Sequence, residues 1–307
     1  MVEGIARCGY RKVEPEDQTL FDPYYDQMNQ PWSGSTAFLN FIAWNDSLPV
    51  YFKEADGMII GLCYESNEGI LVGIPFIGRY TKESVRQAFA ILKEDFNEIG
   101  ERLVIMDVVK WMLPYYDALD DFEFDIEDLR EYMEYIYTVA DFEAGMEKQD
   151  DRYRYRYFMR KNDYEVEEIT PAHKDEILSF MEQIWCADKP CSECHFGCML
   201  DVTERVISAF DKLHVNGILV RVDGRIAGFC VVTKRMGQGI YQFKHAINSI
   251  KGINEYMLRE CYERYLKDCD IINYTEDCGI ESLRRYKMNL ATAYSLSSRL
   301  TLKEIDR

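Results

Sequence analysis

The chain has 307 residues, and its 36 basic and 54 acidic side chains give a formal charge of −18. Hydrophobic residues make up 47% and charged residues 29%, which is typical of a globular protein and excludes a disordered chain, a collagen or a coiled-coil rod. At roughly 100–200 residues a domain, the length fits two domains or one large one. Because the acidic excess repels phosphate backbones, we expect no bulk binding of nucleic acid or anionic membranes, although a local basic site can still hold a phosphorylated ligand.

The N-terminal sequence MVEGIARCGYRKVEPEDQ lacks the apolar stretch of a signal peptide. The most apolar region, residues 58–78, is interrupted by a polar run at 65–68, so no stretch is long enough to span a bilayer. We therefore expect a soluble, cytoplasmic protein without a membrane span. In that setting the ten cysteines are expected to be thiols or metal ligands rather than disulfides.

The predicted elements follow a faint internal repeat. In the first half, a hairpin turn at Asp56-Gly57 leads into an apolar strand. A strand over residues 69–78, a helix over 82–99, a strand over 102–108 and a helix over 110–119 follow in that order. This half of the chain thus predicts an α+β domain.

The second half repeats that order after a turn 167 residues further on, at Asp223-Gly224. Beyond the strand that follows this turn, it predicts a strand over residues 239–247, a helix over 253–267, a strand over 270–274 and a helix over 280–288. Order and spacing agree although residue identity does not, which indicates an ancient duplication, with chance agreement of two α+β segments as the alternative.

The boundary between the halves is predicted near Val139. An acidic, helix-like stretch over residues 140–151 precedes a new domain there, and Pro171 opens a second amphipathic helix. We therefore predict one domain over residues 1–140 and another over 141–307.

The segment over residues 272–290 carries a recognisable pattern. It resembles the Glu-x-Asp-x-Gly-x-x-x-Leu-Arg-x-x-Lys stretch of a bacterial family related to the C-terminal domain of phosphatidylglycerol lysyltransferase. The matching residues, with the two acidic residues adjacent, are Glu276, Asp277, Gly279, Leu283, Arg284 and Lys287. Three further segments, at residues 35–44, 134–142 and 251–257, resemble other elements of the family in the same order. The resemblance therefore covers nearly the whole chain.

Two segments depart from the family pattern. Where the family usually has a run rich in Lys, Arg and His, this chain has DRYRYRYFMRKND over residues 151–163. Where the family often has Glu-Lys-Ala ahead of a helix, this chain has Lys244, His245 and Ala246. These changes affect the expected donor and acceptor more than the fold.

The resemblance implies two tandem GNAT-like domains, an α+β fold in which each domain is a mixed twisted sheet flanked by helices. GNAT is the fold of acyl-CoA N-acyltransferases, and it also underlies transferases that use aminoacyl-tRNA. The resemblance further implies a degenerate N-terminal domain and a C-terminal domain that keeps the site. The expected function is transfer of an acyl or aminoacyl group to a small-molecule or peptide amine. Acyl-CoA or aminoacyl-tRNA is the expected co-substrate, with no tightly bound cofactor.

In a GNAT fold, the turn before the donor helix presents backbone N–H groups to a pyrophosphate at the helix N-terminus. The corresponding turn here is NSIKGI, in which Lys251, Gly252 and Ile253 are the predicted phosphate-binding or tRNA-end-binding residues. The second glycine of the usual pattern is missing, so an ordinary turn into a helix is the alternative.

The expected catalytic residues follow the last predicted strand. Tyr286 lies where GNAT enzymes often carry the tyrosine that protonates the leaving group, and the alternative is a packed core ring. Glu276 stands after the strand and can accept a proton from the attacking amine. Asp277 and His245 are assigned to the acceptor side, although Asp277 can instead cap the following helix and a lone histidine is more often packed.

Basic residues supply the expected phosphate contacts. Arg284 and Lys287 lie three apart on one helix face and can grip a phosphate or carboxylate, with a solvated face as the alternative. The run over residues 152–161 interleaves arginines with aromatics, which suits a nucleotide or the 3′ end of a tRNA. A linker whose arginines pair with surface carboxylates is the alternative.

A cysteine cluster allows a third kind of site. Four thiolates could hold zinc, although their spacing is unusual for zinc modules, and the candidates are Cys186, Cys191, Cys194 and Cys198. A reactive thiol or a merely cysteine-rich loop are the alternatives. Two further functions therefore stay open beside the transferase: a non-catalytic GNAT-fold ligand-binding protein, and an interaction protein regulated by zinc or redox state.

Overall fold

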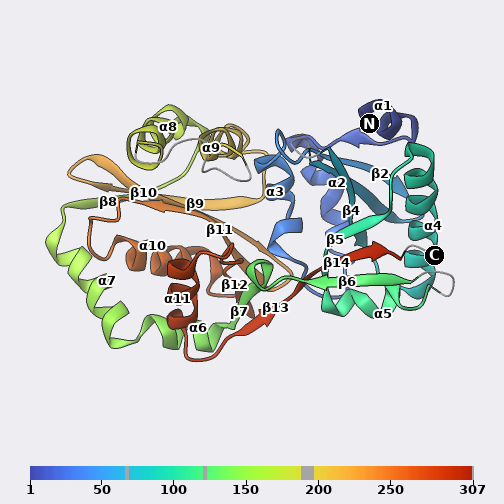
Figure 1. The fold of residues 1–307 in the computed structure, drawn as a ribbon. Coiled ribbons are helices and arrows are strands. Elements are labelled where there is room, and N and C mark those ends of the chain that lie inside the picture. The colour runs from blue at the N-terminus through green and yellow to red at the C-terminus, as the bar shows by residue number, and fades with distance from the viewer. Residues whose placement is uncertain (66–68, 120–122, 188–196, 306–307) are drawn as a thin grey trace. The chain divides into compact units, whose positions relative to one another are not determined.

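A computed structural model describes residues 1–65, 69–119, 123–187 and 197–305, with the side chain of Trp185 not described (Figure 1). The chain forms two compact units. The first unit comprises Met1–Met133 together with Ser297–Arg307, and the second comprises Glu134–Leu296. None of the helices in these described ranges is long and apolar enough to cross a membrane.

The first unit is built on a seven-stranded mixed sheet with the order β1-β2-β3-β4-β5-β14-β6. Its strands are β1 (Arg11–Lys12), β2 (Val50–Ala55), β3 (Met58–Glu65), β4 (Ile70–Gly78), β5 (Val104–Val109), β14 (Arg299–Glu304) and β6 (Phe124–Asp128). Its α-helices are α1 (Val2–Arg7), α2 (Gln18–Tyr25), α3 (Phe38–Ala43), α4 (Lys82–Ile99) and α5 (Leu113–Tyr116).

The second unit has its own seven-stranded mixed sheet, with the order β13-β7-β12-β11-β10-β9-β8. Its strands are β13 (Ser295–Ser297), β7 (Glu134–Thr138), β12 (Ile271–Asn273), β11 (Gln238–Ala246), β10 (Arg225–Arg235), β9 (Val215–Val222) and β8 (Tyr164–Glu168). Its α-helices are α6 (Val139–Met146), α7 (Gln149–Lys161), α8 (Lys174–Phe180), α9 (Met199–Ser208), α10 (Ile253–Cys261) and α11 (Glu281–Leu290). Helices α8 and α9 cover one face of the sheet, and α10 lies on the other face (Figure 1).

The two hairpin turns predicted from Asp-Gly pairs are present. Asp56 and Gly57 join β2 to β3 with φ angles of 50° and 76°, and Asp223 and Gly224 join β9 to β10 with 51° and 74°. Positive φ at both central residues is the requirement of the tight hairpin turn that matches strand twist. The predicted order of strand, strand, helix and strand is confirmed in both units, as β3, β4, α4 and β5 and as β10, β11, α10 and β12.

Two predicted helices differ from the observed ones. The helix predicted over residues 110–119 is a 3₁₀ turn, Lys110–Met112, followed by the four-residue α5 with a proline in its first turn. The helix predicted over residues 253–267 is α10 followed by a π-helical turn, Tyr262–Leu266. The basic run over residues 152–161 lies within helix α7, where Arg152, Arg156 and Arg160 share one face and Arg154 lies on another, so the arginines are not all on one side as they would be in a strand.

Two strands pair with strands that lie far from them in the sequence. The C-terminal strand β14 lies between β5 and β6 of the first unit, with Leu302 opposite Ile105 and Ile126. Strand β7 pairs with β12 in the second unit, with Tyr137 opposite Ile272. Each sheet therefore contains one strand, β14 or β7, that comes from outside the continuous segment that forms the hairpins of that sheet.

The parallel pairing of β11 and β12 in the second sheet is short. The two strands pair only over Gln238–Ile240 and Ile271–Asn273. β12 ends there, whereas β11 continues to Ala246 with β10 as its partner. Beyond Ile240, β11 therefore no longer pairs with β12. We call the point where this pairing stops the wedge, and the candidate site lies there.

Candidate functional site

The loop that follows β12 has an unusual backbone. Thr275, Cys278 and Gly279 have φ angles of 55°, 49° and 73°. The left-handed conformation costs a non-glycine residue about 1–2 kcal/mol, so two such residues within four positions need external support. Contacts from strand β7 and helix α11 supply that support.

Asp277 is the first anchor of this loop. Its side chain is fully buried, and its carboxylate accepts hydrogen bonds from the Tyr135 hydroxyl at 2.8 Å and the Gly279 N–H at 3.0 Å. Arg284 donates to it from Nε and Nη2, both at 3.0 Å. This bond to Asp277 is also the main cause of the raised pKa of Arg284. The geometry favours an anchoring role for both residues, whereas the N-terminus of α11 has Ile280 as its N-cap and no side-chain cap, so Asp277 does not cap that helix.

Lys287 is the second anchor. Its ammonium is buried and donates to the carbonyl oxygen of Tyr274, to the carbonyl oxygen of Glu276 at 2.6 Å and to Thr275 Oγ1 at 3.3 Å. Burial lowers its pKa to about 8, against the opposing pull of the Glu276 carboxylate. A lysine this enclosed fixes the loop and offers no exposed charge to a phosphate.

Glu276 and Tyr286 lie at this anchored loop. The Glu276 backbone is held by Lys287, and its partly buried carboxylate lies 3.9 Å from the Cys278 thiol, which donates to it. The Tyr286 hydroxyl is buried, and no described residue forms a hydrogen bond with it. The loop that carries Glu276 is thus joined to α11, which carries Tyr286, through the anchors Asp277, Arg284 and Lys287.

The structure adds Lys244 to this group. Its ammonium lies 5.0 Å from the ring centre of Tyr286 and 5.6 Å from that of Tyr274. The sequence showed Lys244 only as part of a departure from the family pattern. Its position depends on β11 running past the end of β12, which no local pattern reveals.

His245 lies on the other side of the same strand. Neighbouring residues of a strand point to opposite faces of the sheet. The buried His245 ring lies 5.2 Å from the ring of Phe229, which in turn contacts Phe180 of α8. The sheet therefore lies between His245 and the Tyr286 hydroxyl.

The predicted donor turn packs against helix α7. Gly252 has a φ of 88°, and a Cβ placed on it would lie 2.1 Å from the carbonyl oxygen of Arg154. Ile253 is fully buried in the core. The Lys251 ammonium lies over two α7 rings, 4.9 Å from the centres of Tyr153 and of Tyr157. The glycine thus serves close packing, whereas phosphate binding by this turn stays a prediction, with Lys251 as its best-placed member.

The outer face of α7 is basic. Arg154 pairs with the buried Glu255 at 3.1 Å. Arg152, Arg156 and Arg160, which follow one another at spacings of four residues, are exposed, and none forms an ion pair with a described carboxylate. The linker alternative, in which the arginines of this run pair with surface carboxylates, therefore applies to Arg154 and not to these three.

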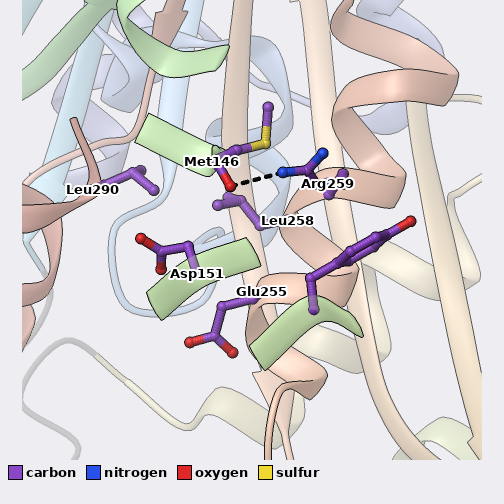
Figure 2. A pocket seen from close by; sticks show the side chains of 7 residues that line it. Met146, Asp151, Glu255, Leu258, Arg259 and Leu290 are labelled. Carbon is purple, nitrogen blue, oxygen red and sulfur yellow. Dashed lines mark hydrogen bonds between the residues drawn. The ribbon is translucent and has the colours of Figure 1, made fainter. Parts of the chain in front are cut away.

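A small hollow lies beneath α7. Figure 2 shows the carboxylates of Asp151 and Glu255 directed into it, while Arg259 donates to the carbonyl oxygen of Met146 at 2.7 Å. Burial and the neighbouring Glu255 raise the pKa of Asp151. The space is suited to a water molecule rather than a substrate.

The cysteine prediction falls partly on residues that the structure describes. Cys186 and Cys198 are partly buried, whereas Cys191 and Cys194 lie outside the described residues. Among the described residues, no group of three or more His, Cys, Asp or Glu side chains converges on a point. A four-cysteine zinc site stays a prediction.

Comparison with known proteins identifies a matching family model and several similar structures. The family model described as the C-terminal domain of phosphatidylglycerol lysyltransferase matches residues 29–293. A conserved protein of unknown function from Bacteroides thetaiotaomicron VPI-5482 is similar in structure, with a TM-score of 0.85 and 20% identity over 96% of this chain and 99% of that chain. L-PGS from Bacillus licheniformis has a TM-score of 0.65 and 13% identity over 95% and 93% of the two chains. A tandem GNAT protein from the clavulanic acid biosynthesis pathway has a TM-score of 0.53 and 9% identity over 97% and 98%. None of the curated proteins matches the sequence.

The chain is therefore an α+β protein of two tandem GNAT-like units, as the resemblance implied. It belongs to the family of phosphatidylglycerol lysyltransferase C-terminal domains. The family model is that of a lysyltransferase, which indicates an acyl or aminoacyl transferase family.

Proposed function

We propose that the protein transfers an acyl or aminoacyl group from an activated carbonyl to an amine, and that the site is the wedge between β11 and β12. The observation that carries this proposal is the anchored loop after β12. It keeps two left-handed non-glycine residues in place and is tied through Arg284 and Lys287 to α11, the helix that carries Tyr286. Such strain is retained where the surrounding contacts fix it, and functional sites are where it gathers.

The proposed reaction uses the two predicted catalytic residues. The amine nitrogen attacks the carbonyl carbon of an ester or thioester, and Glu276, directly or through a water, accepts the proton that the nitrogen releases. Tyr286 donates its hydroxyl proton to the leaving alkoxide or thiolate. Asp277, Arg284 and Lys287 position the loop.

The exposed face of α7 favours a donor carried by RNA over acyl-CoA. Like charges four residues apart destabilise a helix by about 0.2–0.5 kcal/mol a pair, so the stripe of Arg152, Arg156 and Arg160 carries a cost in mutual repulsion. Tyr153, beside this stripe, is 48% exposed and can stack on a base, and Lys251 lies against its ring. In a chain with a charge of −18, such a face suits phosphates. The proposed donor is therefore the aminoacylated 3′ end of a tRNA.

Transfer from two labelled donors tests this function. The wild-type protein is incubated with peptides and polyamines as amines and with either aminoacyl-tRNA or acetyl-CoA, each labelled in the acyl group. We expect transfer from aminoacyl-tRNA. Tyr286→Phe should lower turnover by about 10²-fold or more while donor binding persists, whereas the first-unit control Tyr51→Phe should leave turnover unchanged.

Calorimetry with acetyl-CoA and free CoA separates the alternatives. Micromolar binding, worth about −8 kcal/mol, would replace the RNA donor by a CoA donor. Binding of either donor without transfer would support the non-catalytic ligand-binding protein instead. Normal turnover in Tyr286→Phe would remove this tyrosine from the reaction.

A further inference from the structure

The wedge contains a cation that the reaction above leaves unused. Lys244 stands two residues before the end of β11, on the stretch that β12 does not accompany. It is paired in register with the buried Cys230 of β10, so its side chain points to the sheet face that packs on α10. There its ammonium lies over the rings of Tyr274 and Tyr286, at 5.6 and 5.0 Å.

Lys244 differs from Lys53 and Lys287 in what it contacts. Lys53 pairs with the buried Asp95 at 2.8 Å, and Lys287 donates to three oxygen atoms. The partly buried Lys244 ammonium forms no hydrogen bond or ion pair with any residue in the described ranges. A cation–π contact is worth about 0.5–2 kcal/mol and leaves all three N–H donors without an acceptor.

The surroundings of Lys244 favour an anion. Its charge is one of the influences that lower the pKa of the buried Lys287, so two ammonium groups act on the same small region. The Tyr286 hydroxyl adds a donor that also has no acceptor among the described residues. A negative oxygen entering the wedge would meet donors that no protein group occupies.

On the basis of the proposed function, we infer that Lys244 is a catalytic residue that binds the carbonyl oxygen of the donor and stabilises the charge that develops on it. As the amine nitrogen bonds to the carbonyl carbon, the π electron pair of the carbonyl moves onto its oxygen, which the Lys244 ammonium then holds. When the intermediate collapses, that pair re-forms the carbonyl and the bond to the leaving oxygen or sulfur breaks. The leaving atom takes the Tyr286 proton, and the nitrogen's proton has gone to Glu276, so charge and atoms balance.

Two substitutions at Lys244 test the role. Lys244→Met removes the charge and keeps the length, and we expect kcat to fall about 10²–10³-fold while the donor Kd changes less than about threefold. Lys244→Arg should recover part of kcat. Lys234→Met, which removes the exposed partner of Asp268 from the neighbouring strand β10, is the control and should retain wild-type kcat. A Lys244→Met protein with unchanged kcat, or one that loses donor affinity in proportion to kcat, would overturn the assignment.

A second measurement does not depend on turnover. Thermal unfolding is followed in increasing inorganic phosphate and, separately, acetate, at constant ionic strength. We expect the wild type and Lys234→Met to gain more in Tm than Lys244→Met. If the wild type transfers from neither donor, the proposed function fails, and this comparison alone decides whether Lys244 binds anions. Equal gains in all three proteins would remove the anion site as well.

Discussion

The two units begin their corresponding helices in different ways. In the first unit, Thr81 and Ser84 form a capping box at the start of α4, with each side chain accepting from the other's backbone N–H at 3.0 Å. In the second unit, α10 starts at Gly252 without a side-chain cap. A capped N-terminus has used the N–H groups that would otherwise bind an anion. In the first unit, the capping box therefore occupies N–H groups at the start of α4, whereas no side chain caps the start of α10 in the second unit.

The parallel strands show the same contrast. In the first unit, β4 and β5 pair at Gly73 and Ile105, and aromatic side chains fill the space beyond, where the Tyr80 hydroxyl donates to the carbonyl oxygen of Phe76 at 2.9 Å. The Phe76 ring stacks with that of Tyr116 at 5.9 Å. In the second unit, the corresponding wedge contains the Lys244 ammonium and the Tyr286 hydroxyl.

The acidic residues at the strand ends complete the comparison. Asp107, with a φ of 62° in β5, pairs with Arg299 of β14 at 2.6 Å. The second unit uses Asp277 and Arg284 for a similar pair and in addition keeps Glu276 beside it. The difference teaches that two units with the same order of elements can use the polar groups at corresponding positions differently, with those of the first unit paired to one another.

Removing β14 should have the largest effect and should strike only the first unit. Deletion of residues 299–307 takes the strand between β5 and β6 out of that sheet and exposes both neighbours. We expect the first unit to lose its cooperative unfolding transition, seen in the fluorescence of Trp32, Trp44 and Trp111. Hydrogen exchange of α10 and β10 should stay slow, and loss of protection there would show that the second unit depends on the strand as well.

The buried ion pairs should differ in strength between the units. Asp277→Asn leaves Arg284 beside a neutral, fully buried amide, and we expect a loss of about 3–5 kcal/mol. Asp107→Asn removes a pair whose side chains are 20% and 13% exposed, and the loss should be nearer 1 kcal/mol. Urea unfolding of both variants measures the difference. Equal losses would show that the Asp277 carboxylate contributes no more to stability than the Asp107 carboxylate of the first unit.

Local signals predicted the parts of this fold that neighbouring residues determine. The Asp-Gly turns and the helix over residues 82–99 were predicted because turn conformation and apolar periodicity are encoded within a few positions. The position of β14 in the first sheet was not predicted, because its partner strands lie far away in the sequence. Lys244 and the packing role of Gly252 depend on where β12 ends and on where α7 passes, and neither leaves a local pattern.

Because Lys287 is buried, the free energy of unfolding of the second unit should change with pH in the alkaline range. Its pKa is lowered from 10.5 to about 8, so between these values the unfolded chain holds a proton that the folded chain has released. Stability relative to Lys287→Met should therefore rise as pH rises from 8 towards 10.5, by up to about 3 kcal/mol. Urea unfolding of both proteins at pH 7.5 and pH 10 measures this difference, and a constant difference would mean an ordinary lysine.

The smallest effect concerns the capped helix itself. Thr81→Ala removes the side-chain acceptor for the Ser84 N–H, and loss of such a cap costs about 1 kcal/mol. If the first unit has given up ligand binding, this variant should unfold at lower urea concentration and yet transfer acyl groups and bind donor as the wild type does. The test is sharp because a bound phosphate at α4 would need the same N–H groups. A gain of donor binding on removal of the cap would show that the first unit has retained a second phosphate position, which its own side chains keep closed.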